Sequence, residues 1–352
     1  MPGGYDALLL LSFGGPEGPD DVLPFLRNVT RGRGIADERL AEVAGHYRHF
    51  NGVSPINTQN RALLDAISAD FDGAGIDLRL YWGNRNWHPY VTEAVRQMRQ
   101  DGVRRALVLA TSATSSYSGC RQYRENLADA RASIGPDAPQ LRKLRHYFDH
   151  PGFIEANAAG VRTALATLPA GLRAHARLVF TAHSIPVSMN DTSGPAANGL
   201  YLAQQRESAR LVAAAVRGPG AQYDLVWQSR SGPPQVAWLE PDVNDHLVKI
   251  AAGGAGAVVV SPTGFVSDHL EVRWDLDTEA AKTAADLGLA FARAATAGTH
   301  PAFVAMVREL VLEEIDGAPR GSLGSLGVSG IDCPAGCCPA ASRPAATRAA
   351  GS

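Results

Sequence analysis

Short apolar segments alternate with amphipathic segments along most of the chain, and this alternation constrains the fold more than any other feature. The apolar segments are rich in β-branched, aromatic and leucine residues, which is typical of buried strands. Each strand segment is followed by polar, glycine or proline residues and then by a segment with helical periodicity. The predicted strands cover 5–13, 78–82, 106–110, 140–146, 177–183, 224–230 and 257–261. Such alternation predicts βαβ units, parallel sheets and an α/β fold.

The two halves of the chain begin alike. A strand leads into Phe13-Gly14-Gly15-Pro16 in the first half and into His183-Ser184-Ile185-Pro186 in the second. At 352 residues the chain is long enough for about two domains. We therefore expect two similar doubly wound, Rossmann-like domains with parallel sheets and a cleft between them. The expected units are an N-terminal domain, a C-terminal domain, a helix with a cysteine-cluster extension, and a disordered tail, at 1–150, 151–300, 301–338 and 339–352 respectively.

Charge and hydropathy limit the kinds of partner and the cellular location expected for this chain. The formal net charge is −2, so no global electrostatic attraction to nucleic acid is expected. Apolar runs fall short of the roughly 18–20 residues that span a bilayer. The apolar run near the N-terminus lacks a preceding Lys or Arg and continues into Gly14-Gly15-Pro16, so it indicates a strand rather than a signal peptide. We expect a cytoplasmic protein without a transmembrane segment.

His183 stands at the carboxyl end of a predicted strand. Residues 177–183 form the strand, and Pro186 interrupts it. Ligands of open α/β sheets bind at the carboxyl ends of the strands. A neutral imidazole at this edge could act as a base or bind a transition metal. The alternative is a hydrogen-bonded structural histidine.

Glu271, Asp275 and Glu279 are spaced by four residues in a predicted helix that begins near His269. At 3.6 residues per turn they lie along one face with a drift of about 40° per step. Such a row of carboxylates could relay protons or pass on a hard cation. Alternatively, Asp268 and Glu271 fit a capping box at the start of the helix.

Cysteines are rare and clustered. Cys333, Cys337 and Cys338 fall within six residues, and Cys120 lies far upstream. This is a metal-site pattern rather than a disulfide scaffold. Four thiolates suit zinc or an iron–sulfur cluster, and adjacent cysteines are easier to place on a two-iron cluster than on one zinc. Free thiols in a flexible tail are the alternative.

Two loops of the first half remain ambiguous by sequence. The basic segment Thr30-Arg31-Gly32-Arg33-Gly34 could be a solvated loop or a clamp for carboxylate or phosphate groups. Ser54 precedes Pro55 and fits a helix N-cap followed by proline at the first helical position.

At these residues the chain resembles the ferrochelatases over nearly its whole length. It is most similar to the actinobacterial branch, which inserts Fe²⁺ into coproporphyrin III and carries a [2Fe-2S] cluster. The resemblance implies a chelatase-type fold and a lyase of haem biosynthesis. The matching segments are 11–16, 31–33, 53–56, 181–186, 227–230 and 265–271.

The resemblance also implies roles for individual residues. His183 and Glu271 would be the catalytic pair that handles iron and protons, with Asp275 and Glu279 as an outer metal or proton relay. The cluster would be held by Cys120, Cys333, Cys337 and Cys338. The porphyrin-binding positions would be Ser54, Tyr123, Tyr47, Arg31, Thr30 and Phe13.

Two positions depart from the pattern of some relatives. Phe13 replaces a tyrosine whose oxygen can ligate iron, and His46 replaces a basic residue used for a propionate. Further hypotheses are a protoporphyrin IX ferrochelatase, a non-catalytic tetrapyrrole-binding or haem-delivery protein, and a structural zinc at the cysteines. The resemblance implies a coproheme decarboxylase as the downstream partner.

Overall fold

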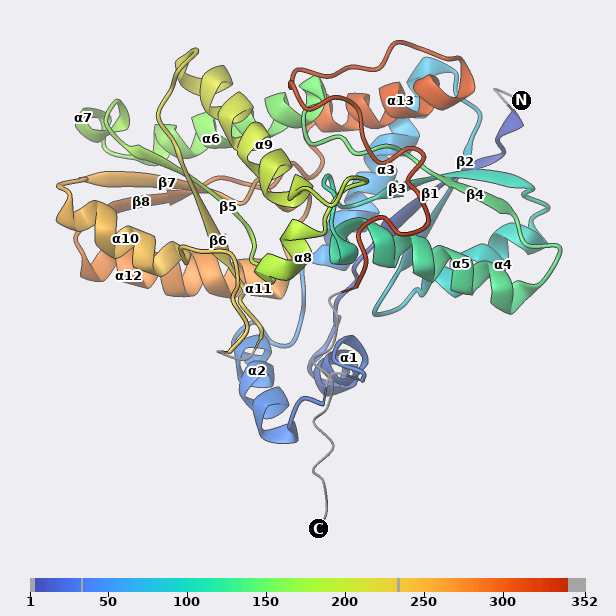
Figure 1. The fold of residues 1–352 in the computed structure, drawn as a ribbon, viewed down its shortest axis with the longest axis horizontal. Coiled ribbons are helices and arrows are strands. Elements are labelled where there is room, and N and C mark those ends of the chain that lie inside the picture. Colours follow the sequence, from blue (N-terminus) through green and yellow to red (C-terminus); the bar gives the residue numbers. More distant parts are fainter. Residues whose placement is uncertain (1–3, 33, 233–234, 341–352) are drawn as a thin grey trace.

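The computed structural model describes residues 4–32, 34–232 and 235–340, and Arg33 and most of the predicted tail lie outside these ranges. The strands are β1 (Ala7–Ser12), β2 (Arg79–Asn84), β3 (Arg105–Ala110), β4 (Gln140–Lys143), β5 (Arg177–His183), β6 (Asp224–Gln228), β7 (Ala257–Ser261) and β8 (Ala290–Arg293). They form two four-stranded parallel sheets with the orders β2-β1-β3-β4 and β6-β5-β7-β8 (Figure 1). The two sheets therefore share one topology, which confirms the predicted α/β fold with two similar parallel sheets.

Helices connect the strands and cover the sheets. They are α1 (Val22–Val29), α2 (Asp37–His49), α3 (Ile56–Ala74), α4 (Val91–Gln100), α5 (Gln122–Ile134), α6 (Pro151–Thr167), α7 (Ala170–Arg173), α8 (Val187–Asp191), α9 (Leu200–Arg217), α10 (Val243–Ala252), α11 (Leu270–Val272), α12 (Ala281–Asp286) and α13 (Pro301–Ile315). A 3₁₀ turn η2 (Pro19–Asp21) and two π-helical segments, η3 (Tyr117–Arg121) and η4 (Arg273–Ala280), complete the list. None of the helices in the described part of the chain is long and apolar enough to cross a membrane.

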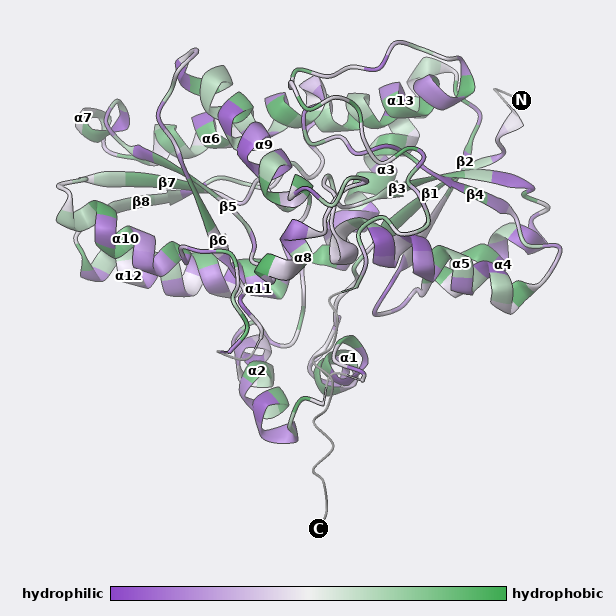
Figure 2. Cartoon of the chain, in the orientation of Figure 1, coloured by the Kyte–Doolittle hydropathy of each residue, from purple (hydrophilic) through white to green (hydrophobic). Residues whose placement is uncertain are grey.

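Strands β1 and β5 each occupy an inner position of their sheet, and we call them the central strands. Both are buried along most of their length. Every residue of β1 is buried, and in β5 the run from Leu178 to Ala182 is buried as well. Near-continuous apolar strands are expected where helices cover both faces of a parallel sheet. Figure 2 shows these apolar strands inside and polar residues on the outer faces of the helices. One core cluster contains both Leu10 of β1 and Phe180 of β5, so apolar packing is continuous between the two halves.

Helices α1 and α2 project from one side of the body (Figure 1). Their apolar contacts include Phe25, Leu26, Leu40 and Tyr47, and the same cluster includes Leu270 of α11. The projecting pair is thereby packed against the segment that carries the predicted carboxylates.

Two local expectations were wrong, and one strand was missed. The single helix expected to begin near His269 is divided into α11, the π-helix η4 and α12. The Ser54 side chain does not cap α3, which begins at Ile56. Strand β8 was missed because Ala-Phe-Ala-Arg is too short to give a clear periodic signal. The predicted domain boundaries stay predictions.

Candidate functional site

The segments that follow β1 and β5 meet through the loop and turn at 268–272. Phe13, directly after β1, stacks on His269 with ring centroids 6.5 Å apart and planes 28° apart. His183 ends β5, and its Nε2 atom lies 3.7 Å from a carboxylate oxygen of Glu271. The carboxyl ends of the two central strands are therefore both close to one short segment, as ligand sites of α/β folds require.

The hydrogen bonding of His183 fixes its tautomer. Nδ1 lies 2.5 Å from the carbonyl oxygen of Ser184, and a carbonyl can only accept, so Nδ1 carries the proton. In the neutral ring Nε2 therefore keeps its lone pair, and it is Nε2 that faces Glu271. The Tyr201 hydroxyl donates to the backbone carbonyl of His183 at 2.8 Å and holds the end of the strand in place.

Glu271 lies between two histidines. One of its carboxylate oxygens is 3.7 Å from Nε2 of His183 and 4.0 Å from Nδ1 of His269. Burial lowers the pKa of His269, which favours its neutral form. Sequence reasoning missed His269 as a site residue, although it lies within the segment 265–271 that carried the resemblance.

The three predicted carboxylates come together, although on a different helix type than expected. Glu271 is on α11, whereas Asp275 and Glu279 are on the π-helix η4. Hydrogen bonds from i to i+5 widen a π-helix, which brings residues four and five apart closer to one line. Burial, followed by the charges of Glu271 and Glu279, raises the pKa of Asp275 to about 7. Asp275 therefore exchanges its proton near neutral pH.

Two residues that sequence reasoning missed hold the Asp275 carboxylate. The Ser229 hydroxyl and the Gln228 amide both donate to its Oδ2 atom, the amide at 3.2 Å. The Gln228 Oε1 atom in turn accepts a 2.7 Å hydrogen bond from Thr181 of β5. Both residues lie within the segment 227–230 noted for its resemblance, but no local pattern predicts that they reach Asp275, which is more than 40 residues away in the chain.

Phe13, Arg85 and Tyr123 form an aromatic and cationic wall in the first half, and Phe13 connects it to His269. The Arg85 guanidinium stacks over Tyr123 at 4.4 Å and lies 5.8 Å from the ring centroid of Phe13. Its Nε donates to Asn126 and its Nη1 to the carbonyl of Ser118. Sequence reasoning missed Arg85, because its contacts depend on residues distant in the chain.

The other predicted porphyrin contacts lie in different settings. Tyr47 is buried, and its pKa is raised by burial and then by the charges of Glu271 and Asp275, so it lies near the carboxylates. Ser54 is buried and packs so closely against Gly15 that a Cβ atom at position 15 would come within 2.6 Å of it. The Thr30 hydroxyl donates to the carbonyl of Leu26 at the end of α1, and Arg31 is exposed. Their roles stay predictions.

The four cysteines lie in one region of the structure, although the described residues hold no preformed metal-binding group there. The Sγ atoms of Cys337 and Cys338 are 3.6 Å apart, and the pKa of Cys338 is raised by burial and then by Cys120 and Cys333. The segment after α13 brings them together, since the His146 amide donates to the carbonyl of Ser329. The Gly194 amide also donates to Cys338 Sγ at 3.1 Å.

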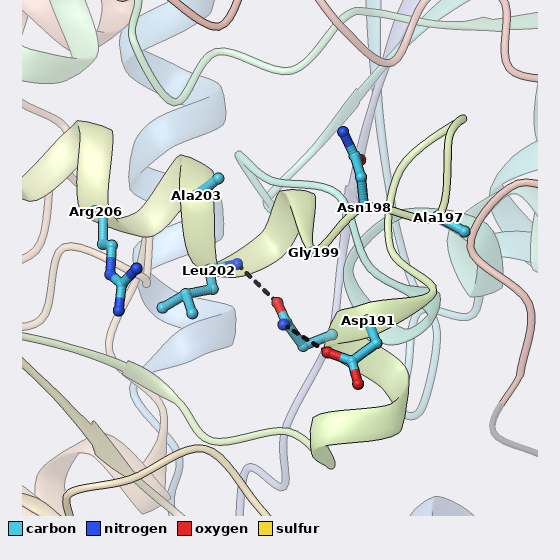
Figure 3. Close-up of a pocket in the computed structure, with 8 residues that line it drawn as sticks. Asp191, Ala197, Asn198, Gly199, Leu202, Ala203 and Arg206 are labelled. Carbon is cyan, nitrogen blue, oxygen red and sulfur yellow. Dashed lines mark hydrogen bonds between the residues drawn. The ribbon is translucent and has the colours of Figure 1, made fainter.

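Across the described ranges, the structure does not place three or more His, Cys, Asp or Glu side chains as a preformed metal-binding group. A cavity of about 490 Å³ lies beside α8 and the start of α9, between Asp191, Asn198 and Arg206 (Figure 3). None of the predicted site residues lines it.

Solved structures resemble the fold at low sequence identity. The sirohydrochlorin chelatase SirB from Bacillus subtilis with Fe³⁺ matches with a TM-score of 0.52 and 11% identity, over 88% of this chain and 96% of that chain. The cobalt complex of SirB matches with a TM-score of 0.50 and 11% identity, over 89% and 96%. At this identity the likeness shows a chelatase-type fold.

Sequence relatives are much closer. A protein from Nocardia farcinica named coproporphyrin III ferrochelatase is 59% identical over 339 residues, covering 94% of this chain and 96% of the relative. A protein of the same name from Streptomyces coelicolor is 59% identical over 349 residues, covering 95% and 93%. The family model described as Ferrochelatase matches residues 5–315. From the site geometry and these matches together, the chain belongs to the ferrochelatase family.

Proposed function

We propose that this protein inserts Fe²⁺ into coproporphyrin III, with His183 and Glu271 as the catalytic pair. The observation that carries the proposal is the free Nε2 lone pair of His183 facing Glu271 at 3.7 Å. The family membership and the name of the relatives at 59% identity support this substrate.

The reaction exchanges protons for metal. Two pyrrole N–H bonds break, two protons leave, and Fe²⁺ bonds to the ring nitrogens without a change in oxidation state. His183 Nε2 has the lone pair needed to accept one proton or to hold Fe²⁺ before insertion. Glu271 stabilises the imidazolium that forms, because its carboxylate lies next to that nitrogen.

Asp275 gives the protons a route away from the ring. Its pKa of about 7 lets it accept and release a proton near neutral pH. Glu279 is exposed at the other end of the row and would pass protons to solvent. The iron needs no protein cage in this scheme, since the porphyrin nitrogens supply most of its ligands.

The wall formed by Phe13, Arg85 and Tyr123 suits a flat, anionic ring. Aromatic faces pack against a macrocycle, and guanidinium N–H groups pair with carboxylates. Coproporphyrin III carries four propionates, for which Arg31, Ser54, Tyr123, Thr30 and Tyr47 remain the predicted contacts. A site that favours a bent ring would lower the barrier, because the bent ring is nearer the transition state.

Anaerobic metallation followed by porphyrin absorbance tests this proposal. Purified protein is given Fe²⁺ with coproporphyrin III and, in parallel, with protoporphyrin IX. We expect faster metallation of coproporphyrin III. A preference for protoporphyrin IX would mean that protoporphyrin IX, and not coproporphyrin III, is the substrate. Binding of both porphyrins without metallation would favour a haem-delivery protein. A coproheme decarboxylase stays the predicted consumer of the product.

We further propose a [2Fe-2S] cluster on Cys120, Cys333, Cys337 and Cys338. The support comes from the thiols: those of Cys337 and Cys338 are 3.6 Å apart, and Cys120 and Cys333 contribute to the raised pKa of Cys338. The described residues hold no preformed metal-binding group, so the thiols would have to draw together around the cluster. The Gly194 amide hydrogen bond to Cys338 Sγ is the kind of contact that stabilises cluster sulfurs. When bound, the cluster would supply one-electron chemistry and a cross-link between these segments.

Spectra of protein purified without oxygen test the cluster directly. We expect iron and sulfide in equal amounts and visible absorbance that Cys333→Ser removes. A colourless protein that contains zinc would replace the cluster by a structural zinc site, and a colourless metal-free protein would contradict both.

A further inference from the structure

Arg293 joins two acidic residues that lie on either side of Glu271. Its two Nη atoms each lie 3.0 Å from one carboxylate oxygen of Asp268. Its Nε and Nη2 atoms also contact the two oxygens of Asp277, at 2.5 and 3.3 Å. The side chain of Arg293 is 16% exposed and that of Asp268 is 10% exposed, so solvent screens the Asp268 pair only weakly.

These contacts act on the segment that carries the predicted catalytic carboxylates. Asp268 comes three residues before Glu271, and Asp277 lies within the π-helix two residues after Asp275. The Asp268 amide also donates to Gln59 of α3, at 2.7 Å. Arg293 therefore fastens both ends of the segment, and through Asp268 it is linked to the first half of the chain.

We propose that Arg293 is a positioning residue that holds the segment 268–277 in its π-helical form and keeps Glu271 opposite His183. The proposal rests on the proposed function of this site. A π-helix is rarely adopted and occurs mainly at functional sites, so outside contacts are needed to maintain it. Arginine suits this task because its planar guanidinium binds two carboxylates at once with fixed geometry.

Arg293 acts through other residues and touches none of the reacting atoms. Asp268 is thereby engaged by a side chain of β8 rather than by a helix cap, since the start of α11 at His269 shows no capping by a side chain. Arg273 adds a second ion pair to Asp277 at 2.5 Å, so the far end keeps one contact when Arg293 is changed. The loss of Arg293 should therefore loosen the segment without unfolding the domain.

Hydrogen exchange and kinetics on Arg293→Gln test the proposal together. We expect amides of 270–280 to exchange roughly tenfold faster, while the β1 amides stay protected. The kcat for metallation of coproporphyrin III should fall roughly 10- to 100-fold with KM for the porphyrin nearly unchanged. Arg293→Lys should be intermediate, because an ammonium cannot bind both carboxylates with the same geometry.

Arg177→Gln is the matched control, since it removes an Arg–Asp pair of the same half that lies at the far end of β5. It should leave both measurements unchanged. If Arg293→Gln matches Arg177→Gln in exchange and in kcat, the proposal is overturned. If Arg293→Gln fails to fold, Asp277→Asn replaces it, and unchanged exchange in that variant also overturns the proposal. Absence of metallation in the unmodified protein would refute the proposed function, while the exchange data would still decide whether Arg293 holds the segment.

Discussion

The two central strands occupy equivalent places in the two sheets and end in different chemistry. β1 ends at Ser12, which pairs in register with Asn84 of β2. β5 ends at His183, which pairs in register with Gln228 of β6. The same backbone position thus carries a buried hydroxyl in one half and a partly exposed imidazole in the other.

The side-chain amides that pair in register with these two strand ends, Asn84 and Gln228, also have different hydrogen-bond partners. Asn84 donates to Asn57 and to the carbonyl of His88, so it ties together the turns of the first half. Gln228 instead donates to Asp275 and so reaches the predicted proton route. A repeated scaffold can therefore use one carboxyl edge for structure and substrate contacts, and the other for proton and metal chemistry.

The largest expected effect separates the two strand ends. His183→Ala should lower metallation by about 10³-fold, because it removes the Nε2 base and metal ligand, and porphyrin binding should remain. Ser12→Ala removes a 3.1 Å contact with Thr111 and should cost about 1 kcal/mol of folding free energy with activity kept. Initial rates and urea unfolding measure both. Equal loss of activity in the two variants would refute the functional distinction between the halves.

The second prediction concerns the pH dependence of stability through Asp275. Its pKa is raised from 3.8 to about 7, so the folded protein keeps a proton that the unfolded chain releases between these values. Stability should therefore fall as pH rises across this window. Asp275→Asn should remove that loss. Above pH 7 the free energy of unfolding of the variant should exceed that of the unmodified protein by on the order of 2–4 kcal/mol. Urea unfolding at pH 5 and pH 8 would detect this, and a constant difference between the two pH values would contradict it.

The third prediction compares the two amides in register. Gln228→Ala should reduce kcat by roughly tenfold, because the Asp275 carboxylate loses one of its donors and shifts. Asn84→Ala should leave kcat near that of the unmodified protein and cost about 1–3 kcal/mol in stability, since it leaves buried partners unpaired. Steady-state rates and chemical denaturation of the two variants provide the comparison. A lower kcat in Asn84→Ala together with an unchanged kcat in Gln228→Ala would contradict the prediction.

Local sequence patterns were sufficient for most of the fold. The strands around β1 and β5, the parallel sheets and the position of His183 at a strand end were predicted, because a fully covered parallel strand needs a continuous apolar run. Gly14 illustrates a position fixed by the backbone, with φ of +81° and a Cβ that would come within 2.7 Å of Asn84. The four-residue spacing of Glu271, Asp275 and Glu279 placed them together, although on an ordinary helix.

What the sequence determined by itself was the alternation of strands and helices and the residues at the strand ends, since these depend on neighbours in the chain. Only the tertiary structure decided the π-helix, the stacking of Arg85 on Tyr123 and the attachment of Arg293 to Asp268 and Asp277. These features depend on side chains that come from separate elements, and short weak elements such as β8 leave no periodic signal. The physical reason is that pairing between distant charges is set by how the elements pack, which local propensity does not record.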